Sequence, residues 1–211
     1  MREAMVRPLG DDPARTIARY AERAGAVVVG PGLGRDAPAD RIVALALALE
    51  RPLVVDADAL WWCADDLASL AARTAPTVIT PHAGEAARLL GIDAEAIGAR
   101  RLASVRALAE RADAVALLKG ADTLVAAPDG RLGVRAQACA ALATAGSGDV
   151  LAGIVAAYLA RGVDGWTAAI AGAAEHVAAG RRAAARARGG AIIAGDLIGC
   201  LRAPDRPGSP A

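Results

Sequence analysis

The chain has 211 residues and a formal net charge of +1, because 24 basic side chains nearly balance 23 acidic ones. This length suits a single domain with a buried core. The near-neutral charge gives no electrostatic footprint for nucleic acid or for an anionic membrane surface, so neither partner is expected. Apolar runs are interrupted well short of a membrane span, and the first residues lack the apolar core of a signal peptide. The widely spaced cysteines Cys63, Cys139 and Cys200 fit neither a disulfide framework nor a metal site, which predicts a cytoplasmic protein.

Short β-branched segments alternate with longer Ala- and Leu-rich helical patterns. The turn Pro128-Asp129-Gly130 favours an antiparallel hairpin, whereas continuous hydrophobic strands joined by helices favour a mostly parallel sheet with helices on both faces. We therefore expect an α/β fold whose ligands bind beyond the carboxyl ends of the strands. The predicted strands are 26–30, 52–56, 76–80, 114–119, 123–127 and 132–135. The predicted helices lie at 39–50, 59–72, 149–160, 166–187 and 196–202, with short ones between 85 and 111.

The segment that runs from Ala143 to Gly153 is the strongest indication of an enzyme. Its small residues Gly146, Ser147 and Gly148 lead into Asp149, and an apolar helical pattern begins directly behind them. Such a turn directs free backbone N–H groups and the positive end of a helix dipole at one spot. The pattern predicts a site for a phosphate or a developing oxyanion, with Asp149 beside it as a candidate base.

A second chemical signal is Lys119, the single lysine of the chain, which precedes Gly120, Ala121, Asp122 and Thr123 at the end of a predicted strand. A compact ammonium near a phosphate is not interchangeable with the guanidinium used at every other basic position. Together with the Gly146–Asp149 turn, Lys119 supplies the cation, the anion cradle and the base that phosphoryl transfer requires. The spacing of a Walker-type P-loop is absent, so we expect a different nucleotide site.

Other polar segments also follow predicted strands. The glycines between Gly30 and Gly34 permit close approach to a ligand, but their spacing is not that of a dinucleotide fingerprint. Asp56 and Asp58 could hold a magnesium-bound water; for Asp58 we favour the N-cap of the following helix. Glu85 could reach a metal or cap its helix. The two histidines differ: His82 lies in a turn that faces a crevice, whereas mid-helical His176 is expected to be packed or at the surface.

The ordered motifs GPGLG, VVDADAL, TPHAGE, LLKGADT and ATAGSGDVLAG resemble the NAD(P)H-hydrate dehydratase family of the ribokinase-like superfamily, from about Met5 to Leu201. The resemblance implies a doubly wound α/β domain over residues 1–203, and residues 204–211 are expected to form a disordered tail. It also implies a hydro-lyase that uses ADP, or ATP, to convert the S-epimer of hydrated NADH or NADPH back to the reduced cofactor. The products with ADP would be NAD(P)H, AMP and phosphate, and Mg²⁺ would neutralise the nucleotide phosphates.

Site residues follow from the same resemblance. Asp149 resembles the catalytic base and would contact the hydrate, while Gly146, Ser147 and Gly148 would form the anion hole. Gly148 would also lie near the adenine nucleotide, whose site would be lined by Lys119, Gly120, Ala121, Asp122 and Thr123. Gly32 and His82 would contact the hydrated nicotinamide nucleotide.

Compared with the family pattern, the chain is expected to be N-terminally short by one to two βα units, and a companion epimerase domain is absent from it. The resemblance further implies a homotetramer and a functional link to an NAD(P)H-hydrate epimerase. Two alternatives stay open. One is a ribokinase-like kinase for a vitamin-precursor alcohol, which would share the anion hole and the base. The other is a non-catalytic nucleotide-binding remnant.

Overall fold

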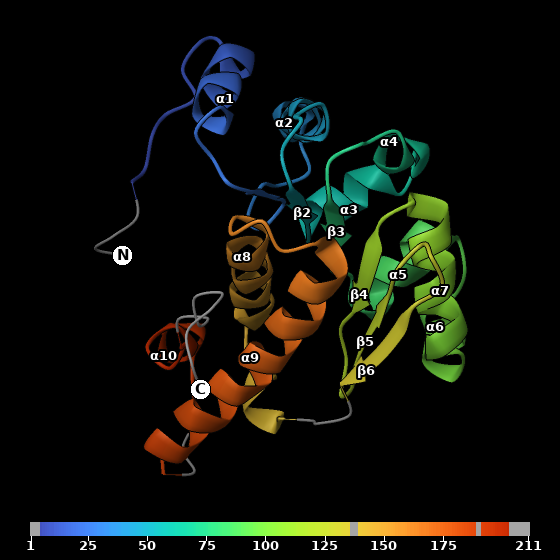
Figure 1. The fold of residues 1–211 in the computed structure, drawn as a ribbon, viewed down its shortest axis with the longest axis vertical. Helices are drawn as coiled ribbons and strands as arrows, with labels where there is room; N and C mark the ends of the chain where they lie inside the picture. Colours follow the sequence, from blue (N-terminus) through green and yellow to red (C-terminus); the bar gives the residue numbers. More distant parts are fainter. Residues whose placement is uncertain (1–4, 136–138, 189–190, 203–211) are drawn as a thin grey trace.

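The computed structural model describes residues 5–135, 139–188 and 191–202, which form a mixed α/β fold around one sheet (Figure 1). The expected tail at 204–211 lies outside the described residues. The strands pair in sequence order: β1 (Val27–Val29), β2 (Leu53–Val55), β3 (Thr77–Ile79), β4 (Val115–Leu118), β5 (Thr123–Ala126) and β6 (Leu132–Arg135). The pairs from β1 to β4 are parallel, and β4–β5 and β5–β6 are antiparallel. The mostly parallel sheet and the hairpin around Pro128-Asp129-Gly130 are thus confirmed.

Helices cover both faces of this sheet. They are α1 (Pro13–Ala21), α2 (Ala37–Leu47), α3 (Asp58–Cys63), α4 (Ala68–Ala71), α5 (Ala83–Leu90), α6 (Ala94–Ala99), α7 (Arg101–Ala112), α8 (Ser147–Leu159), α9 (Gly165–Arg186) and α10 (Ala194–Ile198), with a short 3₁₀ turn η1 (Ala140–Leu142).

Two hydrophobic clusters fill the space between the layers. The first joins one face of the sheet to the helices from α2 to α7, and includes Leu53, Leu60 and Leu108. The second joins the other face to α8 and α9, and includes Val54 and Leu159. Because successive strand residues point to opposite faces, the neighbours Leu53 and Val54 enter different clusters. Both faces of β2 and β3 are buried, which explains why these strands are continuous apolar runs.

The structure differs from the predicted helices in three places. The helix expected over 196–202 is α10, which begins earlier and ends at Ile198. The helix predicted over 59–72 is divided into α3 and α4, with Asp65 and Asp66 between them. Short carboxylates compete for backbone groups and disfavour a helix interior, which accounts for the break. The helix α1 was not predicted from its pattern; Asp12 caps it by accepting from the N–H of Arg15, and Pro13 occupies its first turn.

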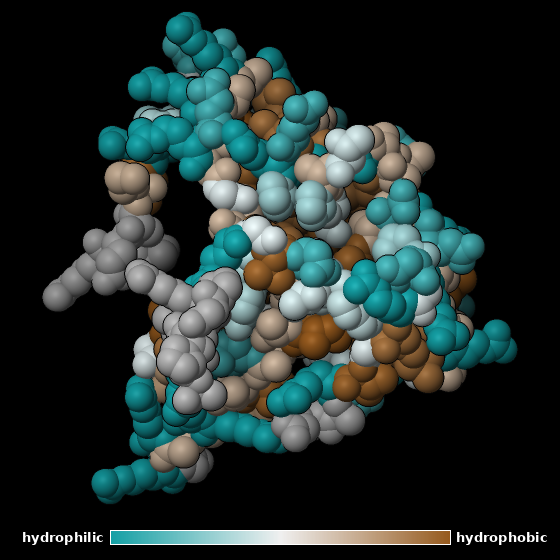
Figure 2. Space-filling view, viewed as in Figure 1, coloured by the Kyte–Doolittle hydropathy of each residue, from teal (hydrophilic) through white to brown (hydrophobic). Residues whose placement is uncertain are grey.

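The outer parts of the molecule differ in polarity. Figure 2 shows hydrophilic side chains over α1 and hydrophobic surface gathered toward the middle of the same face.

The strand β1 pairs only with β2 among the described strands, and Val28 on it is 38% exposed. Within the described residues, no helix has both the length and the apolar character needed to cross a membrane.

Candidate functional site

The centre of the candidate site is the N-terminus of α8. Gly146 is the N-cap residue and has a left-handed backbone with φ of +80°, a conformation that favours glycine. Among the residues that the structure describes, no side chain caps this helix; the Ser147 hydroxyl instead donates to the Leu142 carbonyl at 2.7 Å. The first N–H groups of an α-helix have no partner within the helix. The predicted glycine turn therefore presents an uncapped, positively polarised helix end, as an anion site requires.

Lys119 lies directly beside this helix end. Its Nζ is 2.7 Å from Asp56 Oδ1 and 3.7 Å from Glu85 Oε2. A Cβ atom added to Gly148 would lie 3.4 Å from Nζ and 3.9 Å from Asp56 Oδ2. These are ordinary van der Waals distances, so the helix end packs directly beside the ion pair at Gly148.

The parallel sheet brings these groups together although they are far apart in sequence. Asp56 follows β2, His82 lies just beyond β3 and Lys119 follows β4, so all three stand at the carboxyl ends of neighbouring parallel strands. The Lys119 backbone N–H donates to the Pro81 carbonyl at 2.8 Å and ties two of these strand ends together. Asp56 is only 1% exposed, so its carboxylate depends on Lys119 for charge compensation. Sequence reasoning left the role of Asp56 open, and the structure makes it the partner of the lysine.

A cavity of about 600 Å³ opens over this region, and we call it the Lys119 cavity. The site residues predicted from the sequence that line this cavity are His82, Lys119, Gly120, Ala121, Thr123, Ser147 and Gly148. The remaining wall is mostly apolar and includes Leu142, Leu151 and Val177, while His176 adds a polar ring. A cationic end and an apolar wall in one cavity match a ligand with an anionic group and a planar organic part.

His82 and Glu85 form a capping box at the start of α5. His82 Nδ1 accepts from the N–H groups of Gly84 and Glu85 at 3.0 and 3.2 Å, and Glu85 Oε2 accepts from the His82 N–H at 2.7 Å. The cap, one of the two alternatives for Glu85, is therefore present. The His82 side chain is exposed at the mouth of the cavity, and its Nε2 lies 3.4 Å from Glu85 Oε1.

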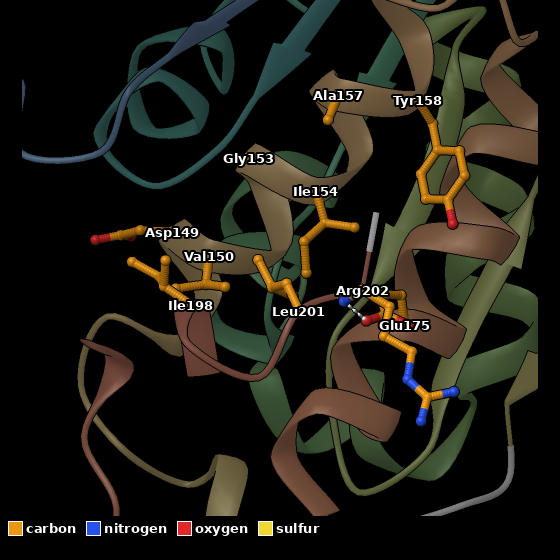
Figure 3. Close-up of a pocket in the computed structure, with 10 residues that line it drawn as sticks. All are labelled: Asp149, Val150, Gly153, Ile154, Ala157, Tyr158, Glu175, Ile198, Leu201 and Arg202. Atoms are coloured by element: carbon orange, nitrogen blue, oxygen red, sulfur yellow. Dashed lines mark hydrogen bonds between the residues drawn. The ribbon is translucent and has the colours of Figure 1, made fainter. Parts of the chain in front are cut away.

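Asp149 lies on the other side of the α8 terminus. Asp149 is exposed and lies at the edge of a separate cavity of about 490 Å³, the Asp149 cavity, and in Figure 3 its carboxylate points away from the other side chains drawn. The wall is formed along α8 by Val150, Gly153, Ile154, Ala157 and Tyr158, and on the opposite side by Glu175, Ile198, Leu201 and Arg202. The Glu175 carboxylate accepts from the Arg202 backbone N–H at 2.7 Å, which joins α9 to the chain beyond α10. Adjacent residues Gly148 and Asp149 thus line different cavities.

Arg101 is a site residue that sequence reasoning missed. From the start of α7 its Nη2 donates to the Asp122 carbonyl at 2.8 Å and reaches the Leu118 and Lys119 carbonyls at 3.4 Å. A Cβ added to Gly120 would come within 2.5 Å of the same guanidinium. Arg101 therefore supports the Lys119–Thr123 turn from behind. Only the three-dimensional structure shows this, because the partners lie 17 to 21 residues apart in the chain.

Gly30, directly after β1, allows the ends of β1 and β2 to approach closely. A Cβ on Gly30 would lie 1.7 Å from the Asp56 carbonyl, so glycine permits this close approach of two strand ends.

Asp58 does not cap α3: Ala57 occupies the N-cap, and Asp58 accepts from the Gly34 N–H at 3.0 Å and pairs with Arg35. The N-cap prediction for Asp58 was wrong because a more distant backbone donor binds its carboxylate. Gly32 is exposed with open space around it and does not line the Lys119 cavity, and neither do Asp122 and Gly146.

Comparison with known proteins places this geometry in a family. The family model for NAD(P)H-hydrate dehydratase matches residues 1–200 of the chain. The chain belongs to the NAD(P)H-hydrate dehydratase family. The bifunctional NAD(P)H-hydrate repair enzyme of Moorella thermoacetica is 42% identical over 208 residues, covering 94% of this chain and 39% of that protein. The chain therefore spans about two fifths of the length of that bifunctional relative.

Shorter members of the NAD(P)H-hydrate dehydratase family and solved structures match as well. The ADP-dependent (S)-NAD(P)H-hydrate dehydratase of Neisseria meningitidis serogroup B is 40% identical over 90% of this chain and 66% of that protein. The Bacillus subtilis ADP/ATP-dependent NAD(P)H-hydrate dehydratase, co-crystallized with ATP and Mg²⁺, has a TM-score of 0.73 and 26% identity over 86% of this chain and 66% of that chain. A ribokinase-like superfamily protein from Enterococcus faecalis also has a TM-score of 0.73, at 27% identity over 88% of this chain and 64% of that chain. The expected ribokinase-like fold is thereby confirmed.

Proposed function

We propose that the protein is an ADP-dependent (S)-NAD(P)H-hydrate dehydratase, which repairs hydrated NADH and NADPH. The observation that carries this proposal is the division made by the α8 terminus, with Gly148 in the Lys119 cavity and Asp149 in the next one. A phosphoryl group bound at this terminus would have the nucleotide on one side and an acceptor hydroxyl on the other. Family membership and the names of the relatives support the hydrate as the acceptor.

On this proposal Lys119 and the helix end stabilise the phosphate charge of ADP, and Asp149 acts as general base. Asp149 takes the proton of the hydrate hydroxyl, and the hydroxyl oxygen bonds to the β-phosphorus of ADP. The bond between that phosphorus and the bridging oxygen, which stays with AMP, breaks. The ring-nitrogen lone pair then expels phosphate, and loss of a proton from the neighbouring ring carbon restores the double bond. Gly146, Ser147 and Gly148 would hold the anion throughout. The family resemblance gives Gly32 and His82 as further contacts of the hydrate; His82 lines the Lys119 cavity, so this contact would require the hydrate to extend past the α8 terminus to the mouth of that cavity.

The donor set fits a Mg²⁺ ion that arrives with the nucleotide. Among the described residues, no group of three His, Cys, Asp or Glu side chains could hold a metal ion. Mg²⁺ in such sites keeps several waters and is bound by one or two carboxylates together with substrate phosphates. Glu85, whose Oε2 lies 3.7 Å from Lys119 Nζ, would be the carboxylate available to it, since Asp56 is buried against Lys119. The ion would neutralise phosphate charge.

The test is a product analysis with hydrated NADH, ADP and Mg²⁺. A dehydratase forms AMP, inorganic phosphate and NADH in equal amounts. A kinase of the same superfamily would leave a stable phosphorylated acceptor, and a nucleotide-binding remnant would bind ADP without forming AMP. Either result would contradict the proposed function. A homotetramer, as the family resemblance implies, is a separate prediction that analytical ultracentrifugation would test.

A further inference from the structure

Trp61, on α3, contacts arginine side chains that come from the segments on both sides of it in the fold. Arg35 follows the glycine segment after β1, and its Cζ lies 5.5 Å from the centre of the Trp61 ring. Arg88 lies on α5, the helix after β3; its Cζ is 4.4 Å from the same ring centre, and its Nε donates to the Trp61 carbonyl at 3.4 Å. A guanidinium within about 6 Å of an indole ring is attracted by the ring quadrupole. Trp61 therefore joins the segment after β1 to the helix after β3.

Asp58 extends this connection to the backbone of the glycine segment. Its Oδ2 accepts from the Gly34 N–H at 3.0 Å, and its Oδ1 lies 3.2 Å from Arg35 Nε. One carboxylate thus holds both the glycine backbone and the guanidinium that lies over Trp61. Gly32 and Gly34 have positive φ values of 67° and 86°. Because glycine has wide conformational freedom, the position of this segment depends on such contacts.

The two segments that Trp61 joins lie at the edge of the sheet where the candidate site is. The glycine segment follows β1 and α5 follows β3, and ligands of parallel sheets bind beyond these carboxyl ends. Under the proposed function, Gly32 in one segment and His82 at the start of the other contact the hydrate. Trp61 itself lines neither the Lys119 cavity nor the Asp149 cavity, so any effect on the reaction passes through these segments.

We propose that Trp61 is a positioning residue for the hydrate, because it fixes the glycine segment after β1 relative to the start of α5 through Arg35 and Arg88. This inference rests on the proposed function, since it takes Gly32 and His82 to be contacts of the hydrate. Loss of the connection would lower the fraction of molecules in which both contacts are in place. The apparent affinity for the hydrate falls by that fraction, whereas the ADP site and Asp149 are unchanged.

The experiment measures kcat and KM for hydrated NADH at saturating ADP. Trp61→Leu removes the ring but keeps apolar bulk, so we expect KM to rise about 5- to 10-fold, with kcat changed less than about 2-fold and ADP affinity unchanged. Trp61→Phe keeps an aromatic face and should recover most of the loss. Arg35→Gln should raise KM about 3-fold, and W61L/R35Q should differ little from W61L, because both substitutions break the same connection.

Trp166 supplies a matched control. Arg131 Cζ lies 5.2 Å from the centre of its ring, so Trp166→Leu removes the same kind of contact. Arg131 follows β5, which is antiparallel to β4 and therefore ends at the opposite edge of the sheet from Lys119. W166L should leave KM for the hydrate unchanged. Hydrogen exchange of residues 30–35 gives a second readout that needs no activity, and it should accelerate in W61L and R35Q but not in W166L.

The outcomes separate this inference from the proposed function. Wild-type turnover with the same KM in W61L and R35Q would overturn only this inference, and so would equal increases in W61L and W166L. Should W61L fail to fold, R35Q decides, because the Arg35 side chain is 58% exposed. Unchanged hydrogen exchange of residues 30–35 in R35Q would overturn the connection whether or not the protein is active. Wild-type protein that binds ADP but forms no NADH would overturn the proposed function and this inference with it.

Discussion

The buried pair of Asp56 and Lys119 predicts unequal effects when either partner is removed. Lys119→Met leaves Asp56, which is 1% exposed, without charge compensation. Asp56→Asn leaves Lys119 with Glu85 Oε2 at 3.7 Å and with a side chain that is 19% exposed. The lysine can therefore find substitute partners, whereas the aspartate cannot. K119M should destabilise the protein more than D56N.

The magnitude follows from the geometry of the pair. At 2.7 Å between Nζ and Oδ1, the direct attraction is about 6 kcal/mol with an effective dielectric constant of about 20. Desolvation of both ions offsets much of this attraction, so the measurable quantity is the cost of leaving one charge unpaired, about 3–5 kcal/mol for a buried ion. We expect about 3–5 kcal/mol for K119M and about 1–3 kcal/mol for D56N. The double variant should lose less than the sum of the two, because neither charge remains.

Urea unfolding of the wild-type protein, the two single variants and D56N/K119M measures these free energies of unfolding and the coupling between the two sites. A coupling of at least about 1 kcal/mol is expected from the contact. Additive losses, or a larger loss for D56N than for K119M, would refute the assignment of Asp56 as a carboxylate that depends on Lys119.

Three further predictions concern the same cavity. Gly148→Ala should weaken ADP binding about 10-fold by calorimetry, because the added methyl group would lie 3.4 Å from Lys119 Nζ, where the proposal places the phosphate; unchanged affinity would contradict this placement of the phosphate. Arg101→Lys should also weaken ADP binding about 10-fold, since an ammonium cannot reproduce the guanidinium contacts with the carbonyls of residues 118, 119 and 122, and wild-type affinity would rule out a positioning role. The lowered pKa of His176 means that the unfolded chain binds its proton more readily, so the free energy of unfolding should fall as pH drops below about 6.5. Urea unfolding at pH 7.5 and at pH 5.5 measures this decrease in the free energy of unfolding. The decrease should be smaller in H176N, because that variant lacks the imidazole.

Much of the sheet could be predicted because its strands are buried on both faces. Continuous Val, Ile and Leu runs mark β2, β3 and β4 directly, and the rule for parallel sheets then places Asp56, His82 and Lys119 at one edge. The pairing of Asp56 with Lys119 spans 63 residues, so no local pattern could predict it. The polar partner of Asp58 was missed for the same reason, since Gly34 is 24 residues away.

Other features were beyond a pattern-based prediction for local reasons. The helix α1 was missed although its pattern is amphipathic and Asp12 and Pro13 mark its start; its nine residues are polar on average and bury only Ala21. Periodicity also cannot tell which polar residue of a buried helix faces a cavity. His176 lies among small residues of α9, and its unpaired nitrogen is visible only in three dimensions.

Recovery of NADH absorbance tests the proposed repair activity most directly. The protein is mixed with hydrated NADH, ADP and Mg²⁺, and the reaction is compared with that of Asp149→Asn, whose ADP affinity is measured in parallel. We predict that wild-type protein restores the absorbance of reduced nicotinamide in an ADP-dependent way, and that D149N binds ADP but turns over at least about 100-fold more slowly. No recovery by folded, ADP-binding wild-type protein, or equal rates in D149N, would contradict the proposal that Asp149 at the α8 terminus is the base of an NAD(P)H-hydrate dehydratase.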